Sequence, residues 1–268
     1  MLNKRLGQHF LINKSIVDLI VKIGNVSKKD VVLEVGPGKG VLTEMLAQKA
    51  KKVIAVEKDK ELVEYLKDKF INQKNVEIIY GDILKTSTKN HGLKTVDYKL
   101  IANIPYYITS KFLRIFLSDK ELRPSLMVLM LQREVAERII AKDGKESLLS
   151  LSVKAYGEPE VIKIVKRGNF FPPPKVDSAI IKITTSPPNP LSLVRRGGKK
   201  RDINLSSGGE VEKILGIARI AFQQKRKMLR HSLNKNIPEK YQNMRPEELK
   251  LEDWKSIYLF QSVQSPKP

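Results

Sequence analysis

Short apolar runs alternate with segments of helical periodicity from residue 31 to residue 185, and this alternation limits the folds that the chain can adopt. Buried strands are expected at residues 31–35, 53–56, 76–80, 100–102 and 126–131. Amphipathic helices are expected at residues 41–50, 59–70, 110–117 and 134–141. Helices in such a series connect parallel strands by right-handed crossovers. The sequence therefore predicts an α/β fold with a mostly parallel, doubly wound sheet, whose ligands bind at the carboxyl ends of its strands.

The last part of the chain follows a different pattern. Two later strands, at residues 161–165 and 179–184, are expected to form an antiparallel pair. Residues 186–209 are rich in Pro, Gly, Ser and basic residues and have no periodic apolar face. Short helices are expected at residues 211–222, 225–233 and 251–259. This pattern predicts a large domain at residues 1–185, a basic flexible linker or insertion at 186–209 and a small all-helical domain at 210–268.

The chain is strongly basic. Its 268 residues include 50 Lys and Arg against 29 Asp and Glu, which gives a net charge of +21. This excess favours a polyanionic partner, such as nucleic acid or an anionic membrane surface, although a basic proteome would also produce it. Residues 190–235 hold twelve Lys or Arg against three acidic residues. The positive charge is therefore concentrated toward the C-terminal part of the chain.

The sequence has no Cys and no long apolar segment. Without Cys, neither a disulfide scaffold nor a Cys-ligated zinc module is expected, and a reducing compartment is favoured. The longest apolar run, residues 126–131, is far shorter than the roughly 20 residues that a membrane-spanning helix needs. The N-terminus also lacks an apolar signal core. We therefore expect a cytoplasmic protein with no metal and no membrane partner.

A glycine-rich loop follows the first predicted strand. Glu34 precedes the spacing Gly-x-Gly-x-Gly, which is formed by Gly36, Gly38 and Gly40. Glycine lets the backbone turn sharply and lets a ligand approach the backbone amides. Dinucleotide sites usually have Gly-x-Gly-x-x-Gly, whereas an acidic residue before the first glycine suits a ligand with a cationic amino-acid group. The loop therefore favours S-adenosylmethionine as the cofactor.

Acidic residues follow the next two predicted strands. Glu57 ends the second strand, where a carboxylate can accept hydrogen bonds from both ribose hydroxyls of a nucleoside. Asp82 follows the third strand, where it can accept a hydrogen bond from an adenine amino group. Each residue taken alone also fits a solvated strand end or a turn. Suitable groups at three successive strand ends favour a nucleoside-binding site.

The tetrapeptide Asn103-Ile104-Pro105-Tyr106 follows the fourth strand and is the candidate catalytic segment. The exocyclic amine of adenine is a poor nucleophile, because its lone pair is delocalised into the ring. The Asn103 side-chain oxygen and the Ile104 carbonyl, which Pro105 aims, are suited to accept both amine hydrogens. The Tyr106 ring is suited to stack on the base. No general base is needed before attack, because the methyl donor is already a sulfonium and positioning supplies the rate.

These motifs and three others together resemble the ribosomal RNA adenine N6-dimethyltransferases along the whole chain. The segments that carry the resemblance are residues 4–11, 34–40, 103–106, 170–178 and 222–229. The resemblance implies a Rossmann-like methyltransferase domain and a helical RNA-binding domain. It also implies dimethylation, from S-adenosylmethionine, of two adjacent adenosines in the loop near the 3′ end of small-subunit rRNA, in free RNA or in a pre-30S particle.

The resemblance further implies roles for individual residues. Contacts with S-adenosylmethionine are implied for His9, Leu11, Gly36, Gly38, Glu57, Asp82 and Asn103. Phe170 is implied to pack on the target base, opposite Tyr106, although a Phe beside three prolines is by itself typical of core packing. RNA contacts are implied for Lys225, Arg226, Lys227 and Arg230, in a basic helix. The sequence departs from the family pattern in its longer, more basic stretch at 186–209 and at Tyr107, where a smaller polar residue is common.

Other functions are compatible with parts of this pattern. A large-subunit rRNA adenine methyltransferase that confers antibiotic resistance would look similar at residues 103–106. A non-catalytic RNA-binding assembly or transcription factor can keep the fold, but Glu57, Asp82 and Asn103 argue for retained chemistry. DNA adenine methylation is disfavoured, because that tetrapeptide usually has a second Pro in place of Ile104. We expect a small-subunit rRNA methyltransferase that acts as a monomer.

Overall fold

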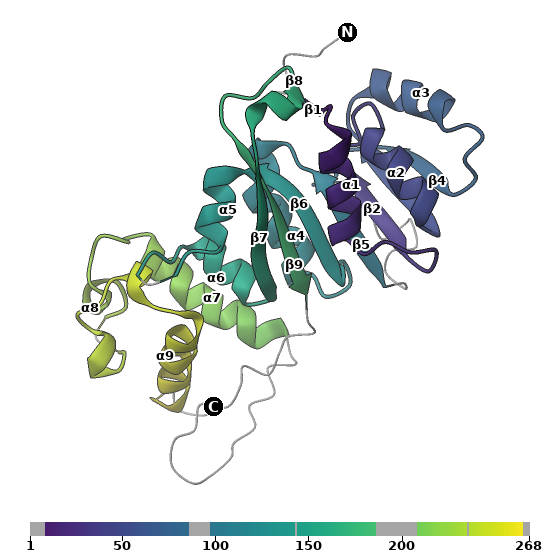
Figure 1. The fold of residues 1–268 in the computed structure, drawn as a ribbon. Helices are drawn as coiled ribbons and strands as arrows, with labels where there is room; N and C mark the ends of the chain where they lie inside the picture. Colours follow the sequence, from purple (N-terminus) through teal and green to yellow (C-terminus); the bar gives the residue numbers. More distant parts are fainter. Residues whose placement is uncertain (1–8, 86–96, 143, 186–207, 235, 265–268) are drawn as a thin grey trace. The chain divides into compact units, whose positions relative to one another are not determined.

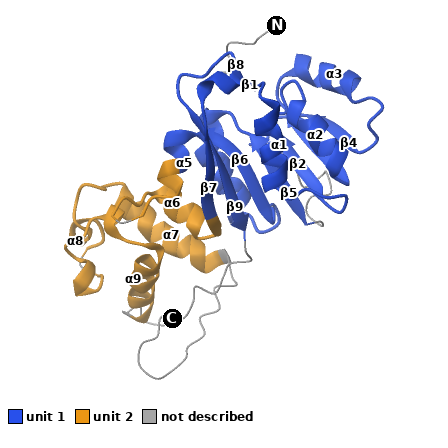
Figure 2. Cartoon of the chain, viewed as in Figure 1, with its two compact units in different colours: residues 1–136, 159–185 blue, residues 137–158, 186–268 orange. Residues whose placement is uncertain are grey.

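The computed structural model describes residues 9–85, 97–142, 144–185, 208–234 and 236–264 (Figure 1). The chain divides into two compact units (Figure 2). The first unit comprises Met1–Ala136 and Pro159–Thr185, and the second comprises Glu137–Glu158 and Ser186–Pro268. Residues 4–8 of the N-terminal motif and residues 186–207 of the expected linker lie outside the described residues.

A seven-stranded sheet with the order β4-β3-β2-β5-β6-β9-β7 forms the centre of the first unit. Its strands are β2 (Val31–Val35), β3 (Lys52–Glu57), β4 (Val76–Tyr80), β5 (Tyr98–Asn103), β6 (Leu126–Gln132), β7 (Gly157–Val165) and β9 (Ser178–Thr185). Strands β2 to β6 run parallel, and β9 is antiparallel to β6. After β4 the chain returns to the other side of β2, so that β5 lies next to β2. A doubly wound sheet binds its ligands beyond the strand ends at such a reversal.

Helices flank the sheet in the first unit (Figure 1). They are α1 (Lys14–Ile23), α2 (Val41–Lys49), α3 (Lys60–Lys69), α4 (Thr109–Ser118) and α5 (Arg133–Ile139), the last of which runs into the second unit. Apolar residues on one face explain why these segments form helices against the sheet. In α4, for example, Phe112, Leu113 and Phe116 are all buried. Burial of these faces against the sheet fixes the helices and the loops that precede them.

A separate sheet of two short strands holds the N-terminal segment in place. It pairs β1 (Phe10–Leu11) with β8 (Phe170–Phe171), antiparallel. In this sheet Leu11 lies opposite Phe170, and both side chains belong to the hydrophobic core. The backbone N–H of Ile12 extends the pairing by donating to the carbonyl of the residue before β8, at 3.0 Å. This pairing joins parts of the chain that are about 160 positions apart.

The strands and helices expected between residues 31 and 185 are present, with small shifts at their ends. The two late strands are hydrogen-bonded neighbours, and β9 is inserted between β6 and β7. Among the α-helices and strands of the described residues, α1, β1, β8 and α6 (Leu148–Lys154) were not expected.

The second unit consists of helices α6, α7 (Gly208–Phe222), α8 (Leu229–Ser232) and α9 (Leu251–Gln264). Trp254 of α9 is fully buried, with its ring centroid 6.2 Å from that of Phe222. Residues 137–158 were expected in the larger domain, but the Tyr156 hydroxyl donates to Glu212 at 2.6 Å in this unit. No helix within the described part of the chain is long and apolar enough to cross a bilayer.

The prediction of a helix at residues 225–233 is wrong for the first half of that segment. Helix α7 ends at Phe222, and residues 223–227 form turns before the short helix α8 begins. Residues 223–228 are all exposed, and Leu229 is the first buried residue after them. A short helix needs a buried face for its stability. The run Lys225-Arg226-Lys227 provides no such face, so the expected basic helix is a basic turn.

Candidate active site

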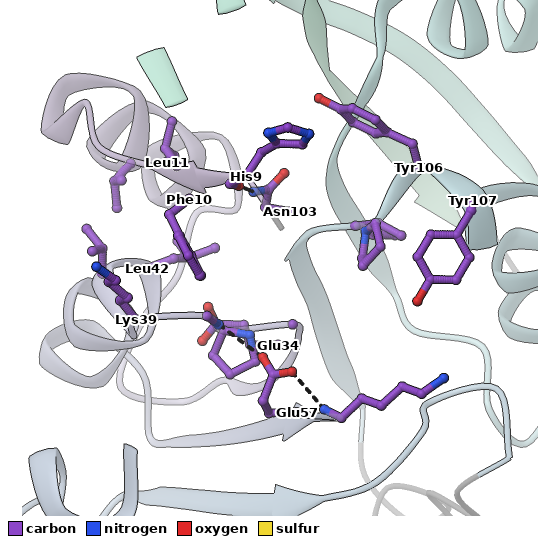
Figure 3. Close-up of a pocket in the computed structure, with 18 residues that line it drawn as sticks. His9, Phe10, Leu11, Glu34, Lys39, Leu42, Glu57, Asn103, Tyr106 and Tyr107 are labelled. Atoms are coloured by element: carbon purple, nitrogen blue, oxygen red, sulfur yellow. Dashed lines mark hydrogen bonds between the residues drawn. The ribbon is translucent and has the colours of Figure 1, made fainter. Parts of the chain in front are cut away.

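A cavity opens at the carboxyl ends of β2, β3 and β5 in the first unit (Figure 3). Its wall is supplied by the β1 segment, the glycine loop after β2, the end of β3 and the tetrapeptide after β5. The residues expected at the site that line this cavity are His9, Leu11, Gly36, Gly38, Glu57 and Asn103 to Tyr106. The view in Figure 3 places two carboxylates on one side, and His9, Asn103 and Tyr106 on the other.

The glycine loop needs glycine for steric reasons. Gly36, Gly38 and Gly40 have φ values of 67°, 59° and 75°, a region that other residues rarely adopt. A Cβ atom on Gly38 would lie 2.8 Å from the Phe10 ring, and one on Gly40 would lie 2.8 Å from the Phe70 ring. The loop therefore presents bare backbone to the cavity, directly against the N-terminal segment.

Glu57 joins the glycine loop to the end of β3. Its carboxylate accepts hydrogen bonds from the backbone N–H groups of Gly38 at 3.2 Å, Lys58 at 2.8 Å and Asp59 at 3.0 Å. The side chain is 6% exposed. Burial raises the pKa of Glu57 above its ordinary value, and the three hydrogen bonds oppose that shift.

Glu34 places a second buried carboxyl group in the same wall. It is 1% exposed, and its Oε2 atom has no hydrogen-bond partner among the described residues. Burial raises the pKa of Glu34 to about 8, and the negative charge of Glu57 adds to the shift. A buried polar atom without a partner is costly unless a ligand supplies one. The arrangement therefore favours a ligand that brings a cation or hydrogen-bond donors to Glu34.

Asn103 ends β5 and is held by the N-terminal segment. Its amide nitrogen donates to the His9 carbonyl at 3.3 Å, so its amide oxygen is the group suited to accept from a ligand. The backbone N–H of Ile104 donates to the Met130 carbonyl of β6 at 3.2 Å. These bonds fix the start of the tetrapeptide to both the sheet and the residue before β1.

Two contacts hold the side chain of Tyr106: a hydrogen bond at its hydroxyl and a ring contact with His9. Its hydroxyl shares a 2.7 Å hydrogen bond with the hydroxyl of Ser178, at the start of β9. The His9 ring lies with its centroid 6.4 Å from that of Tyr106, at an interplanar angle of 26°. Burial raises the pKa of Tyr106, and the bond to Ser178 opposes the shift. The phenol is therefore neutral and is suited to contact a base through its ring.

Two expected site residues do not line the cavity. Phe170 is 2% exposed and packs in the core opposite Leu11, because the alternation of β8 turns its ring inward and the ring of Phe171 outward. Asp82 binds Lys58 instead, with the Lys58 ammonium 3.0 Å from the Asp82 carboxylate. Lys58 itself lines the cavity.

Further residues in the wall were not expected from the sequence as direct contacts. Phe10 and Leu42 add apolar surface, and Lys39 lies with its ammonium 5.4 Å from the centroid of the Phe10 ring. Tyr107 is 67% exposed at the cavity. The position of Phe10 depends on the pairing of β1 with β8, for which the sequence carries no local signal.

The residues expected to bind RNA lie in the second unit. Lys225, Arg226 and Lys227 are exposed in the turn between α7 and α8. Arg230 donates to the side chain of Asn243 at 2.5 Å and is only partly exposed. The three turn residues are therefore the more accessible cations of the four.

The fold and the cavity define a Rossmann-like methyltransferase, and solved structures support this class. A dimethyladenosine transferase from Plasmodium falciparum is 27% identical, with a TM-score of 0.76 over 95% of this chain and 98% of that chain. The 23S rRNA methyltransferase ErmE is 22% identical, with a TM-score of 0.72 over 94% of this chain and 99% of that chain. The likeness to ErmE concerns the fold alone.

Sequence relatives identify the family. The ribosomal RNA adenine dimethylase family matches residues 1–257, and the chain belongs to this family. A ribosomal RNA small subunit methyltransferase A of Dehalococcoides mccartyi strain 195 is 40% identical over 96% of this chain and 87% of that relative. A protein of the same name from Halothermothrix orenii is 37% identical over 88% of this chain and 75% of that relative.

We predict that Glu34 makes the stability of the protein depend on pH. Because its pKa is raised in the folded state to about 8, the folded protein binds more protons than the unfolded chain between about pH 5 and pH 8. The free energy of unfolding should therefore fall by roughly 3 to 5 kcal/mol as the pH rises through this range. Urea unfolding at several pH values measures this dependence.

The Glu34→Gln variant should lose that part of the pH dependence, because the amide does not titrate. Glu44→Gln is the matched control, since Glu44 is exposed on α2 and pairs with Lys69. Its curve should run parallel to that of the unmodified protein. Equal slopes for the unmodified protein and Glu34→Gln would contradict the assignment.

Proposed function

We propose that the protein transfers methyl groups from S-adenosylmethionine to the N6 atoms of two adjacent adenosines in the 3′-terminal hairpin loop of small-subunit rRNA. The observation that carries the proposal is that Glu34, Glu57 and Asn103 line one cavity. Groups suited to a cationic nucleoside cofactor thus lie beside a group suited to an adenine amine. The relatives support the small subunit as the substrate, since they are named for it.

The cavity fits S-adenosylmethionine on three grounds. The unpartnered, buried oxygen of Glu34 suits the positive charge of the cofactor. The loop at Gly36 and Gly38 lines the cavity with backbone that carries no Cβ atom, so a ligand can approach its amide groups. Glu57 is a buried acceptor at a strand end, where a ribose is usually held. We propose that His9 and Leu11 close the cofactor site from the N-terminal side, where both residues line the cavity.

Asp82 is a less direct part of this proposal. Its carboxylate also accepts from the backbone N–H of Leu84 at 3.1 Å, which holds it at the end of β4. Contact with the adenine amino group of the cofactor requires Lys58 to release its bond to Asp82. Both side chains of this pair are partly exposed, so such a pair contributes little stability and can open.

The chemistry of the proposed reaction depends on positioning. S-adenosylmethionine supplies a methyl group on a sulfonium, which is reactive without a general base. The Asn103 amide oxygen and the Ile104 carbonyl accept the two hydrogens of the adenine amine and orient its lone pair. Tyr106 provides a ring face for the base, and Pro105 fixes the turn between them. The proton leaves to water after methyl transfer. Repetition on the monomethylated amine gives dimethyladenosine.

The turn between α7 and α8 presents three exposed basic side chains that are suited to bind RNA. We propose that the basic turn at residues 225–227 contacts RNA phosphates, and that Arg230 supports it through Asn243. The substrate is small-subunit rRNA or a pre-30S particle, and the protein acts as a cytoplasmic monomer. Phe170 is proposed to support the N-terminal wall from the core, rather than to touch the base, since its ring is buried.

Methylation of small subunits that lack this modification tests the proposal. With labelled S-adenosylmethionine, we expect dimethyladenosine at two adjacent positions near the 3′ end of the RNA. Asn103→Ala should lower the single-turnover rate by about 100-fold or more while RNA affinity stays nearly unchanged, because a preorganised acceptor acts mainly in the transition state. Label only in large-subunit RNA, or no label, would contradict the proposed function.

Asn75→Ala is the matched control for Asn103→Ala. The Asn75 amide donates to the carbonyl of Ala47 at 2.8 Å, at the amino end of the strands and away from the cavity. Its loss should lower stability and leave the rate of methyl transfer normal. A near-normal rate in Asn103→Ala would contradict the role of that residue.

RNA binding should depend steeply on salt and involve the basic turn. Replacing Lys225, Arg226 and Lys227 with Gln should flatten the slope of log affinity against log salt concentration by about 0.7 to 0.9 for each RNA phosphate that the variant no longer neutralises. Filter binding or fluorescence anisotropy at several salt concentrations measures this slope.

A second triple variant controls for the change in net charge. Lys49, Lys51 and Lys74 are exposed at the amino ends of the strands, opposite the cavity. Their replacement with Gln removes the same charge and should leave the slope nearly unchanged. Equal flattening in both triple variants would show that the basic turn has no special role.

A further inference from the structure

Residues 172–178 follow β8 and bond to two residues of the cavity wall. The carbonyl of Pro172 accepts a hydrogen bond from the His9 ring nitrogen Nδ1 at 2.8 Å. Ser178, at the other end of the segment, bonds to Tyr106 at 2.7 Å. One stretch of chain thus holds two residues of the cavity wall that come from distant parts of the sequence.

Asp177 anchors this segment next to Ser178. Its carboxylate accepts from the Arg167 backbone N–H and from the Lys166 ammonium, each at 3.0 Å. The Asp177 carbonyl accepts from the backbone N–H of Arg133 at 3.0 Å. These bonds tie the residue before β9 to both the turn after β7 and the end of β6, so the position of Ser178 is well defined.

Ser178 is fully buried, with an exposed fraction of 0%. A buried hydroxyl requires a hydrogen-bond partner, and the Tyr106 hydroxyl provides one. Ser178 is also fixed through the backbone, because it pairs with Gln132 in the antiparallel register of β6 and β9. The Tyr106 hydroxyl is therefore hydrogen-bonded to a residue that the sheet holds in place.

We propose that Ser178 is a positioning residue for methyl transfer, which fixes the plane of the Tyr106 ring through its hydrogen bond. The proposal rests on the proposed function, in which a base stacks on Tyr106. Stacking on a base requires a ring face at a defined angle, and a tyrosine ring can turn about two side-chain bonds. The hydroxyl of Tyr106 thus sets the orientation of the ring, whereas the ring face makes the contact with the base.

A cycle of four proteins tests this coupling: the unmodified protein, Ser178→Ala, Tyr106→Phe and the double variant. In single-turnover methylation of unmodified small subunits, each single variant should lower the rate by about 3- to 10-fold, as expected for loss of one hydrogen bond. The double variant should be no slower than either single variant, because both changes remove the same bond. Affinity for S-adenosylmethionine, measured by calorimetry, should stay within about twofold.

Ser125→Ala is the matched control, since the Ser125 hydroxyl donates to the Tyr98 carbonyl at the amino ends of β5 and β6, away from the cavity. It should leave the rate unchanged in either background. Tyr106→Phe removes the bond from its other end, so the test does not depend on the folding of Ser178→Ala. The proposal would be overturned if the fold-loss of rate in the double variant equalled the product of the two single losses. A normal rate in both single variants would overturn it as well. Failure of the unmodified protein to form dimethyladenosine would instead overturn the proposed function.

Discussion

The Glu57 carboxylate accepts three backbone hydrogen bonds, and these bonds join the glycine loop to the end of β3. The loop has room to bend only because Gly36, Gly38 and Gly40 adopt left-handed backbone conformations. Its position in turn sets the surface against which Phe10 packs. This side of the cavity thus depends on one buried side chain and on the absence of three Cβ atoms. The remaining groups are arranged around this frame.

Burial of Glu34 beside Glu57 has an energetic cost, which is visible in the raised pKa of Glu34. A site that must accept a cation gains from such an arrangement, because a positive ligand restores the favourable charged form of the carboxyl group. The other side of the cavity has a different character, with the amide of Asn103 and the ring of Tyr106 held by neutral hydrogen bonds. Carboxyl groups on one side and neutral groups on the other are suited to a reaction between a cationic methyl donor and a neutral amine.

Much of the first unit could be predicted from the sequence, because its strands and helices carry strong local periodicity. Helix α1 could also have been found, since Asn13 is a helix cap and Ile16, Val17 and Ile20 follow at helical spacing. The pairing of β1 with β8 could not, because two-residue strands so far apart have no periodic signal. The sequence left Phe170 open between core packing and contact with a base, and the register of β1 and β8 shows that its ring is buried.

We propose that the buried carboxyl groups of Glu34 and Glu57 form a site for a cationic cofactor. Calorimetry of S-adenosylmethionine binding at pH 7, in buffers that differ in ionisation enthalpy, tests it directly. Because the pKa of Glu34 is about 8 in the free protein, binding of a cation should release close to one proton, and Glu34→Gln should release almost none. Binding without proton release, or equal release from both proteins, would contradict the account.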